Sequence, residues 1–578
     1  MTYSEIREKF VDFFKAKGHR LVPSASLIPM HDASVLLTVA GMQQFKPYFT
    51  GEPSPYGDRA ISIQKCFRTS DIDEVGDDSH LTFFEMFGNF AFNGSVSKDE
   101  AIQWAWEFLT SPNHMGIQAS RLSATYYDGS RVGTRADMTA QEILATLIGL
   151  TDISAQGEDN FWGPTGGEGP CGPTVEFYID GVEVWNIVFN EYYCSVEKEL
   201  TPLSSGLGID TGMGLERLLT AVTEEAGNMY ETDAFLPIIE AIHKHVPEVG
   251  AEINRSMKII ADHLRGSVFL LSDHVRPSNK EQGYILRRLL RRAILHLDKL
   301  RVLPAFDELL EVIITKYGDF YPELLTEKDM ILQLANLEKD KFLKTMVEGK
   351  KELDKLLASH GNKSSGEDAF NLFATYGLPL DFIKEETSVN EDEFNKKFQQ
   401  HQDISRAGVK SKFGGHGLSS GATVSSADRQ KITRFHTAAH LLHAALIKFL
   451  GNEIKQAGSD LSVERLRFDF TFPRALSPEE KTLVEDWVNK QIESNLPVKH
   501  ETIKLTDALA SGAVAFFKEK YPDEVEMYTI LSPDNSEVVS KEICGGPHVT
   551  KTGEIGKFKI VKEQSSSAGV RRIKATID

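Results

Sequence analysis

The chain has 578 residues, of which 41% are hydrophobic and 26% are charged, the balance of an ordinary soluble globular protein. Its length exceeds what one hydrophobic core usually organises, so we expect about three to four domains. No apolar stretch approaches the roughly 20 residues that cross a bilayer, and the first residues lack the basic-then-apolar pattern of a signal peptide. Its four cysteines show no paired spacing, as is typical of a reducing compartment. We therefore predict a cytoplasmic protein without a membrane partner.

The net charge is 64 − 84 = −20, which argues against general affinity for nucleic acid. A local basic surface remains compatible with this value, because phosphates respond to cations within a Debye length of about 10 Å.

The first predicted element is an amphipathic helix that begins with a capping box at Thr2 and Glu5 and ends at Gly18. Its apolar face carries four residues, Ile6, Phe10, Phe13 and Phe14. From there to about Val246, short strand-like runs such as Trp185-Asn-Ile-Val-Phe189 alternate with Gly/Pro turns. This texture predicts an α+β domain with a sheet at its centre.

Later segments change texture. Residues 252–402 show long helical periods, and residues 405–428 are Gly/Ser-rich, as in a linker. Ser477 and Pro478 predict a helix start, with Leu483, Val484, Trp487 and Val488 facing inward. Residues 555–577 alternate like strands. We expect four segments: a domain at 1–246, a helical domain at 247–404, a linker at 405–430 and an α+β domain at 431–578.

The run Asp210-Thr-Gly-Met-Gly-Leu-Glu-Arg217 contains two glycines that let the backbone approach a ligand, followed by the start of a helix. A Gly-x-Gly alone is more often a structural turn. The whole string, however, resembles motif 3 of class II aminoacyl-tRNA synthetases, and Gln64-Lys-Cys-Phe-Arg68 with Thr82-Phe-Phe-Glu-Met-Phe-Gly-Asn-Phe90 resembles motif 2 of alanyl-tRNA synthetases. The resemblance implies the class II antiparallel sheet flanked by helices.

The same resemblance implies an ATP site. Arg217 lies on the adenine ring through a cation–π contact, and Phe84 stacks on the other face. Arg68 bridges the substrate carboxylate and the α-phosphate, a bidentate role that suits a guanidinium group. The remaining phenylalanines of motif 2 are interpreted as core residues: Phe83, Phe87 and Phe90. The loop between Arg68 and Phe84 is shorter than is usual in the family.

The resemblance further implies selection of a small amino acid. Trp162, in an Asn-Phe-Trp run, and Val188 enclose the alanine side chain, while Asp210 binds the ammonium with Gly212 beside it. The expected reaction joins alanine to ATP as alanyl-adenylate and then transfers alanine to tRNA. Such catalysis is mainly positioning and charge neutralisation by Arg68, Arg217 and Mg²⁺.

Ile285-Leu-Arg-Arg-Leu-Leu-Arg-Arg-Ala-Ile-Leu295 predicts a helix with arginines at i,i+4 spacing beside a buried apolar stripe. As a bare pattern this is more often a solvated face than an RNA site. The neighbouring Arg276–Tyr284 and Thr375–Asp381 segments resemble alanyl-tRNA synthetases, where an asparagine and an aspartate read the G·U pair of the tRNA(Ala) acceptor stem. The matching residues are Asn279 and Asp381, with Arg291 nearby.

His436-Thr-Ala-Ala-His440 places two imidazoles on one helical face, and Cys544-Gly-Gly-Pro-His548 supplies two further ligands. A His₃Cys set is suited to tetrahedral Zn²⁺. The glutamate of His-Glu-x-x-His is missing, so this is not a metalloprotease pattern. The pairs resemble the editing domain of alanyl-tRNA synthetases, although Pro547 replaces the usual threonine, and Gln456 matches its editing glutamine. Such a domain hydrolyses Ser-tRNA(Ala) and Gly-tRNA(Ala), because an alanine pocket rejects serine only about a hundredfold.

The chain is short for this family. The Gly/Ser-rich stretch stands where a β-barrel usually lies, and we expect neither that barrel nor the family's C-terminal domain, and hence a monomer. Two alternatives stay open: a free-standing hydrolase that edits misacylated tRNA, and a non-catalytic tRNA-binding paralogue. The first requires a degenerate N-terminal half, and the presence of Arg68, Phe84, Asp210 and Arg217 argues against it. The second keeps the fold without the reaction, and alanine-dependent exchange of pyrophosphate into ATP would separate it from a synthetase.

Overall fold

The computed structural model describes residues 1–29, 35–131, 133–164, 166–223, 225–246, 250–360, 363–410, 426–451, 454–514, 524–532, 538–567 and 570–578. They form two compact units. Unit 1 comprises residues 1–275 and 280–339, and unit 2 comprises residues 276–279 and 340–578. Among the described residues, no helix is both long and apolar enough to span a membrane.

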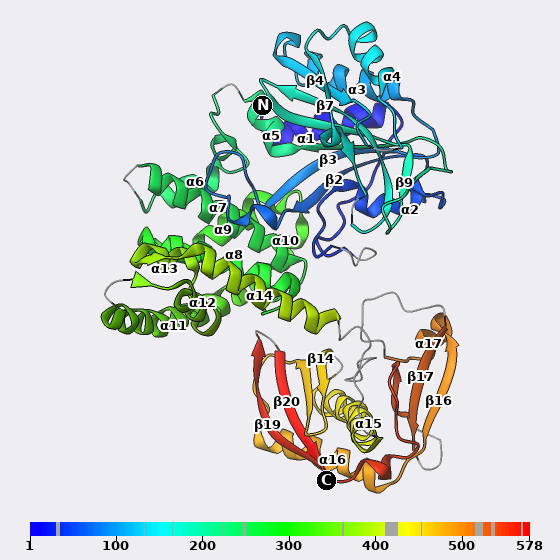
Figure 1. The fold of residues 1–578 in the computed structure, drawn as a ribbon, viewed down its shortest axis with the longest axis vertical. Coiled ribbons are helices and arrows are strands. Elements are labelled where there is room, and N and C mark those ends of the chain that lie inside the picture. The colour runs from blue at the N-terminus through cyan, green and yellow to red at the C-terminus, as the bar shows by residue number, and fades with distance from the viewer. Residues whose placement is uncertain are drawn as a thin grey trace. The chain divides into compact units, whose positions relative to one another are not determined.

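Unit 1 is built on a sheet of eleven strands within the described residues (Figure 1). Its main path runs β1-β2-β3-β11-β8-β7-β4-β5. Neighbours along this path are antiparallel except at the two ends, where β1 pairs with β2 and β4 with β5 in parallel. The strands are β1 (Arg20–Leu21), β2 (Arg59–Phe67), β3 (Phe83–Ala91), β4 (Leu122–Tyr127), β5 (Ile153–Gln156), β6 (Phe161–Trp162), β7 (Gly169–Ile179), β8 (Val182–Asn190), β9 (Tyr192–Cys194), β10 (Leu200–Pro202) and β11 (Gly208–Gly214).

Helices α1 (Tyr3–Ala16) and α3 (Lys98–Thr110) cover one face of this sheet. Helix α1 begins with the predicted capping box at Thr2. Phe10 stacks on Phe87 of β3 with ring centroids 4.4 Å apart, and Phe108 meets Trp185 of β8 edge-on at 5.7 Å. Because side chains alternate along a strand, the residues between these anchors project from the opposite face.

The remaining helices of unit 1 are α2 (Lys46–Phe49), α4 (Met138–Glu142), α5 (Leu215–Val222), α6 (Leu236–His243), α7 (Ala251–Ser272), α8 (Glu281–Lys299), α9 (Phe306–Gly318) and α10 (Pro322–Thr326). Helix α11 (Lys328–His360) continues into unit 2. Helices α7 and α8 pack along each other, and most of α7 from Ser256 onward is buried.

Unit 2 contains a helical part and an α+β part. The helical part holds β12 (Lys363–Ser364), α12 (Gly366–Tyr376), α13 (Leu380–Glu386), β13 (Ser388–Val389) and α14 (Glu391–Lys410). The α+β part holds α15 (Ser426–Leu450), β14 (Gln456–Leu461), β15 (Leu466–Thr471), α16 (Pro478–Glu493), β16 (Val498–Lys504), α17 (Leu505–Ala510), β17 (Glu524–Leu531), β18 (Val538–Ile543), β19 (Phe558–Ser567) and β20 (Val570–Ile577).

The α+β part has two sheets among its described strands, ordered β14-β15-β20-β19 and β16-β17-β18. Helices α15 and α16 supply its core, with Val484 and Val488 buried as predicted. The inward placement predicted for Leu483 is wrong, since its exposure is 51%. The predicted linker is also narrower at both ends, because α14 extends to Lys410 and α15 begins at Ser426. Residues 411–425 lie outside the described residues.

Candidate active site and candidate metal site

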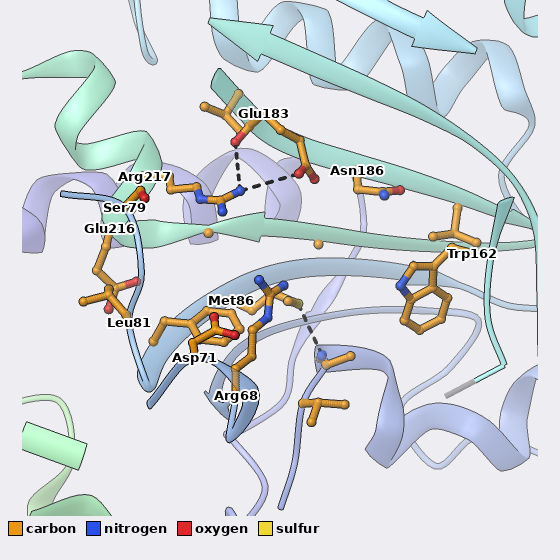
Figure 2. Close-up of a pocket in the computed structure, with 18 of the residues that line it drawn as sticks. Arg68, Asp71, Ser79, Leu81, Met86, Trp162, Glu183, Asn186, Glu216 and Arg217 are labelled. Atoms are coloured by element: carbon orange, nitrogen blue, oxygen red, sulfur yellow. Dashed lines mark hydrogen bonds and ion pairs between the residues drawn. The ribbon is translucent and has the colours of Figure 1, made fainter. Parts of the chain in front are cut away.

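A pocket of about 280 Å³ opens on the face of the unit 1 sheet opposite α1 (Figure 2). Three adjacent strands, β3, β11 and β8, form its floor. Every second residue of each strand faces the cavity, as strand geometry requires. These residues are Phe84 and Met86 of β3, Asp210, Gly212 and Gly214 of β11, and Val184, Asn186 and Val188 of β8.

All seven residues predicted for ATP and alanine line this one pocket. Some come from the three floor strands and others from segments beside the floor, and together they span positions 68 to 217 of the sequence. The seven are Arg68, Phe84, Trp162, Val188, Asp210, Gly212 and Arg217.

Arg68 and Phe84 are brought together by the β2–β3 hairpin. The Arg68 amide donates to the Thr82 carbonyl at 2.8 Å, which closes the hairpin loop at its base. The guanidinium carbon of Arg68 lies 4.9 Å from the centroid of the Phe84 ring. Phe84 keeps 9% exposure toward the pocket. The other three motif 2 phenylalanines are fully buried, as predicted: Phe83, Phe87 and Phe90.

Arg217 lies in the first turn of α5, directly after β11. Its Nη1 atom is 3.4 Å from the Glu183 carbonyl oxygen and 3.5 Å from the Glu183 carboxylate. The Arg217 side chain remains 37% exposed. A cation held this loosely at the pocket rim can lie over the ring of a planar ligand.

Asp210 is 4% exposed and lies opposite Val188 in the β11–β8 ladder. Burial raises the pKa of its carboxyl group to about 8. An ammonium group beside this carboxyl would stabilise its ionised form, so binding of a cationic amine and ionisation of Asp210 are coupled.

Two apolar residues predicted for the alanine side chain, Trp162 and Val188, line the pocket together with Asp210. Trp162 of β6 lies opposite Gly172, and Val188 is 3% exposed. A Cβ atom at Gly212 would lie 3.1 Å from the Met86 sulfur. Glycine at this position therefore keeps the strand and the thioether in contact at the floor.

Several pocket residues escaped sequence reasoning. Asn186 stands two residues before Val188, so strand alternation within the Trp-Asn-Ile-Val-Phe run was a signal for it. Glu183 and Asp71 carried no signal, because Glu183 lies near the start of β8 and Asp71 lies in a short 3₁₀ helix, Ser70–Ile72. Further lining residues of this kind are Ser79, Leu81, Glu216 and Met229.

The arginines of α8 do not form an open stripe. Arg287 and Arg291 both donate through Nε to one oxygen of the buried Glu338, at 3.1 and 2.8 Å. Arg288 pairs with Asp73, and Arg292 is buried. The periodicity of the sequence predicted the helix, but it did not indicate the acidic residues that pair with its arginines.

Arg292 donates to the carbonyl oxygen of Ile72 and contacts His263 at 3.1 Å. The two residues predicted to read the tRNA, Asn279 and Asp381, belong to unit 2 and not to the unit that contains α8. Asn279 is exposed. Asp381 falls within α13, but its side chain lies outside the described residues.

Four side chains of unit 2 converge as predicted from the sequence. The ligand atoms of His436, His440, Cys544 and His548 all lie within 4.8 Å of one another. Cys544 Sγ is 3.0 Å from His436 Nε2. Three imidazoles and a thiol at this spacing fit a tetrahedral metal such as Zn²⁺.

Polar partners contact two of the three imidazoles of this cluster. His436 Nδ1 faces the Pro547 carbonyl oxygen at 3.1 Å, and His548 Nδ1 faces Thr437 Oγ1 at 3.1 Å. A ring fixed through one nitrogen can present the other nitrogen to a metal, as a ligand histidine requires. Gln456 begins β14 opposite Phe470 and is not one of the four converging side chains.

Comparison with known proteins agrees with this geometry. Residues 5–457 match the family described as "tRNA synthetases class II (A)", and residues 525–574 match the "Threonyl and Alanyl tRNA synthetase second additional domain". The alanine–tRNA ligase of Borrelia hermsii is 41% identical over 100% of both chains. That of Treponema pallidum is 41% identical over 99% of this chain and 98% of its own. That of Thermotoga maritima is 37% identical over 100% of this chain and 80% of its own.

The fold and the pocket thus define a class II aminoacyl-tRNA synthetase, and the predicted sheet flanked by helices is confirmed. Within that class, the chain belongs to the alanine–tRNA ligase family. The resemblance inferred from the motifs is therefore confirmed over the full length of the chain.

Proposed function

We propose that this protein activates L-alanine with ATP and transfers it to the 3′ end of tRNA(Ala), as an alanine–tRNA ligase. One observation carries the proposal: the residues expected for the nucleotide, Arg68, Phe84 and Arg217, share a single cavity with an ammonium-binding aspartate, Asp210. Trp162 and Val188 line the same cavity, and we assign to them the enclosure of the alanine side chain.

In the first step an oxygen of the alanine carboxylate attacks the α-phosphorus of ATP, supplied as its Mg²⁺ complex. The bond from the α-phosphorus to the bridging oxygen breaks, and pyrophosphate leaves. Phe84 and Arg217 hold adenine between them, and Asp210 with Gly212 beside it holds the ammonium. Arg68 contacts the attacking carboxylate and the α-phosphate, so that it neutralises charge where charge develops.

In the second step a ribose hydroxyl at the 3′ end of the tRNA attacks the alanyl carbonyl carbon, and AMP leaves. Residues 1–246 carry this chemistry, and residues 247–404 receive the acceptor stem. Asn279 and Asp381 read its G·U pair, with Arg291 nearby. Arg287 and Arg291 both donate to Glu338. To contact a phosphate of the tRNA, Arg291 would have to weaken or break its bond to this carboxylate.

The second site edits errors. His436, His440, Cys544 and His548 would hold Zn²⁺, within an editing domain of residues 431–578 beyond the 405–430 linker. A zinc ion held there would supply Lewis acidity for hydrolysis of the ester of a misacylated tRNA. Gln456 lies in the same domain and contributes to hydrolysis of Ser-tRNA(Ala) and Gly-tRNA(Ala). The carbonyl oxygen of Pro547 faces His436 Nδ1 and orients this ring.

Alanine-dependent exchange of pyrophosphate into ATP tests the main proposal. We expect exchange by the unaltered protein and its loss in Arg68→Ala. Absence of exchange with retained hydrolysis of Ser-tRNA(Ala) would identify a free-standing deacylase instead. Absence of both with retained tRNA binding would identify a non-catalytic paralogue.

Two further measurements test the second site and the assembly. Zinc content should be one ion per chain, and Cys544→Ala should lose both the metal and Ser-tRNA(Ala) hydrolysis while keeping exchange. We also propose a cytoplasmic monomer that depends on the acceptor stem. A stable dimer in sedimentation at micromolar concentration would contradict the monomer.

A further inference from the structure

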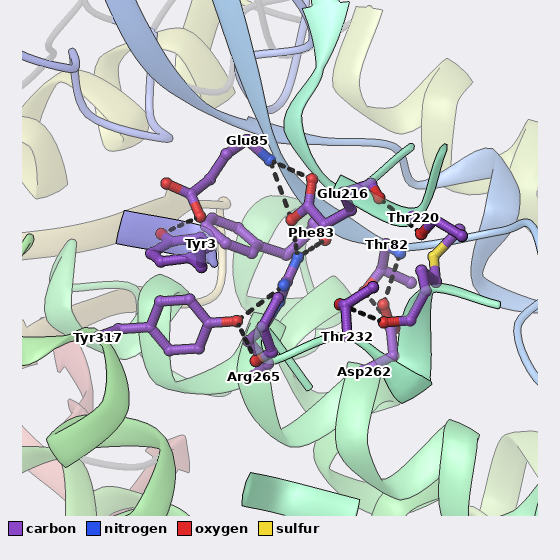
Figure 3. A network of polar contacts seen from close by, with 12 residues as sticks. Tyr3, Thr82, Phe83, Glu85, Glu216, Thr220, Thr232, Asp262, Arg265 and Tyr317 are labelled. Carbon is purple, nitrogen blue, oxygen red and sulfur yellow. Dashed lines mark hydrogen bonds and ion pairs between the residues drawn. The ribbon is translucent and has the colours of Figure 1, made fainter. Parts of the chain in front are cut away.

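A buried cation lies behind the pocket, outside the residues that line it. Arg265, in the middle of α7, has no exposed surface. Its Nη2 atom donates to the Phe83 carbonyl oxygen at 2.6 Å and to Glu216 Oε1 at 2.5 Å, and Nη1 donates to the Tyr317 hydroxyl at 2.9 Å (Figure 3). One side chain of α7 therefore joins β3, α5 and α9.

The contacts of this cation bracket Phe84. The peptide before Phe84 is held through the Phe83 carbonyl, which accepts from Arg265. The peptide after it is held through the Glu85 amide, which donates to Glu216 at 3.1 Å. Because Glu216 is also the anionic partner of Arg265, the backbone on both sides of Phe84 depends on one ion pair.

The same ion pair also holds the first turn of α5, from which Arg217 reaches the pocket. Glu216 immediately precedes Arg217 in the first turn of α5. The pair therefore holds the first turn of α5 at the residue next to the one proposed to cover adenine. Phe84 reaches the pocket from β3 and Arg217 reaches it from α5, and the Arg265–Glu216 pair ties these two elements together.

Helix α7 holds β3 at a second point. Asp262, one turn before Arg265, accepts from the Thr82 amide at 2.9 Å and from the Thr82 hydroxyl at 2.6 Å. Thr82 and Phe83 are therefore bonded to α7 just before Phe84, and the Glu85 amide is bonded to Glu216, the partner of Arg265.

We propose that Arg265 is a positioning residue of the adenine site, which sets the spacing between Phe84 and Arg217. The inference rests on the proposed function only in taking those two side chains as the adenine contacts. Stability alone does not call for this arginine, since a buried ion pair is often no more stabilising than well-packed apolar residues. Its fork serves three acceptors on three different elements, a geometry that an ammonium group does not reproduce.

The test compares Arg265→Lys and Arg265→Met with Tyr317→Phe in alanine-dependent pyrophosphate exchange. Tyr317→Phe is the matched control, because it removes one bond of Arg265 that does not lead to the pocket. We expect Arg265→Met to raise KM for ATP by about tenfold or more, the loss expected for a buried charged hydrogen bond. Arg265→Lys should raise KM for ATP less, while KM for alanine and kcat change little and Tyr317→Phe resembles the unaltered protein.

A second variant covers the case in which Arg265→Met fails to fold. Glu216→Gln keeps the shape of the acceptor and weakens the pair, and it should raise KM for ATP in the same direction. The proposal is overturned if the soluble variants lower thermal stability but leave KM for ATP unchanged. It is also overturned if Tyr317→Phe raises KM for ATP as much as Arg265→Lys does. Failure of the proposed function itself looks different, because the unaltered protein would then show no exchange.

Discussion

Arg68 covers the ring of Phe84 inside the pocket, with 4.9 Å between the guanidinium carbon and the ring centroid. In the proposed reaction the pocket side of this ring receives adenine, and Arg68 serves the carboxylate and the α-phosphate instead. Phe84 therefore contacts a cation in this structure and adenine in the proposed complex. In that complex the ring stacks on one face of adenine, while Arg217 covers the other face.

The proposed stacking on Phe84 can be tested through the KM for ATP. Phe84→Leu should raise KM for ATP by roughly tenfold, because it removes stacking while keeping apolar volume. Phe84→Tyr keeps the ring and should stay close to the unaltered protein. Both are measured by pyrophosphate exchange at saturating alanine. Equal KM values for ATP in the leucine and tyrosine variants would mean that the ring is only a core residue.

Asp210 predicts a pH dependence of alanine binding. Burial raises the pKa of its carboxyl to about 8 in the empty pocket. Binding of an ammonium requires the ionised form, so alanine binding releases a proton below that pH. The KM for alanine should therefore fall as pH rises through 8, by roughly tenfold between pH 7 and pH 9 for a single titration. A plateau is expected above pH 9 until the amino group of alanine itself loses its proton.

The control for this pH profile is Asp210→Asn. The amide keeps the size of the side chain but neither titrates nor offers a charge, so alanine should bind weakly at all pH values and the slope below pH 8 should vanish. Calorimetry in two buffers of different ionisation heat measures the released proton directly. An unchanged slope in Asp210→Asn would assign the titration to another group.

The loop between Arg68 and Phe84 is anchored from α8. Arg292 is buried and donates to the carbonyl of Ile72, whereas the neighbouring Arg288 pairs with Asp73 at the surface. Arg292→Gln should lower the free energy of unfolding of unit 1 by about 2–4 kcal/mol, since it strands buried polar groups. Arg288→Gln should cost less than about 1 kcal/mol. Urea denaturation of both variants checks the difference, and equal costs would contradict it.

Much of the pocket could be predicted because its residues lie in short strings that resemble the motifs of class II synthetases. Asp210 and Gly212 share a strand face by the alternation rule, whereas their register opposite Val188 and Asn186 comes from the pairing of β11 with β8. The four metal-site residues were also predictable, since the i,i+4 spacing of His436 and His440 fixes their common direction on α15.

Other features depended on contacts that no local pattern encodes. Arg291 was predicted to lie near the residues that read the tRNA acceptor stem, and the pattern did not indicate its partner Glu338, which lies on another helix, 47 positions later. Arg265 stands in an apolar run of α7, where an arginine suggests nothing without knowledge of Glu216 and Phe83. Leu483 carries the right periodicity but turns outward, because Val484 and Val488 already fill the core beneath α16.

The metal cluster has a further support in Glu542. One oxygen of this carboxylate lies 3.1 Å from His440 Nε2, and the other lies 3.2 Å from His443 Nδ1. Both the carboxylate and the two imidazoles are nearly unexposed. A carboxylate that accepts from a ligand histidine fixes its ring and its tautomer, and loss of such a partner typically lowers metal affinity by about 10–100-fold.

We therefore expect Glu542→Gln to bind zinc more weakly than the unaltered protein by that factor, in competition with a chromophoric chelator. Glu554→Gln is the matched control, because Glu554 is an acidic residue of the following segment that bonds Thr550 and Lys551 and touches none of the four ligands. Pyrophosphate exchange should be the same in both variants, since the cluster lies in unit 2 and the pocket in unit 1. If both variants release zinc equally, Glu542 has no special part in holding His440. A loss confined to Glu542→Gln would show that this carboxylate orients the ligand, and that the cluster is organised for a metal rather than for packing.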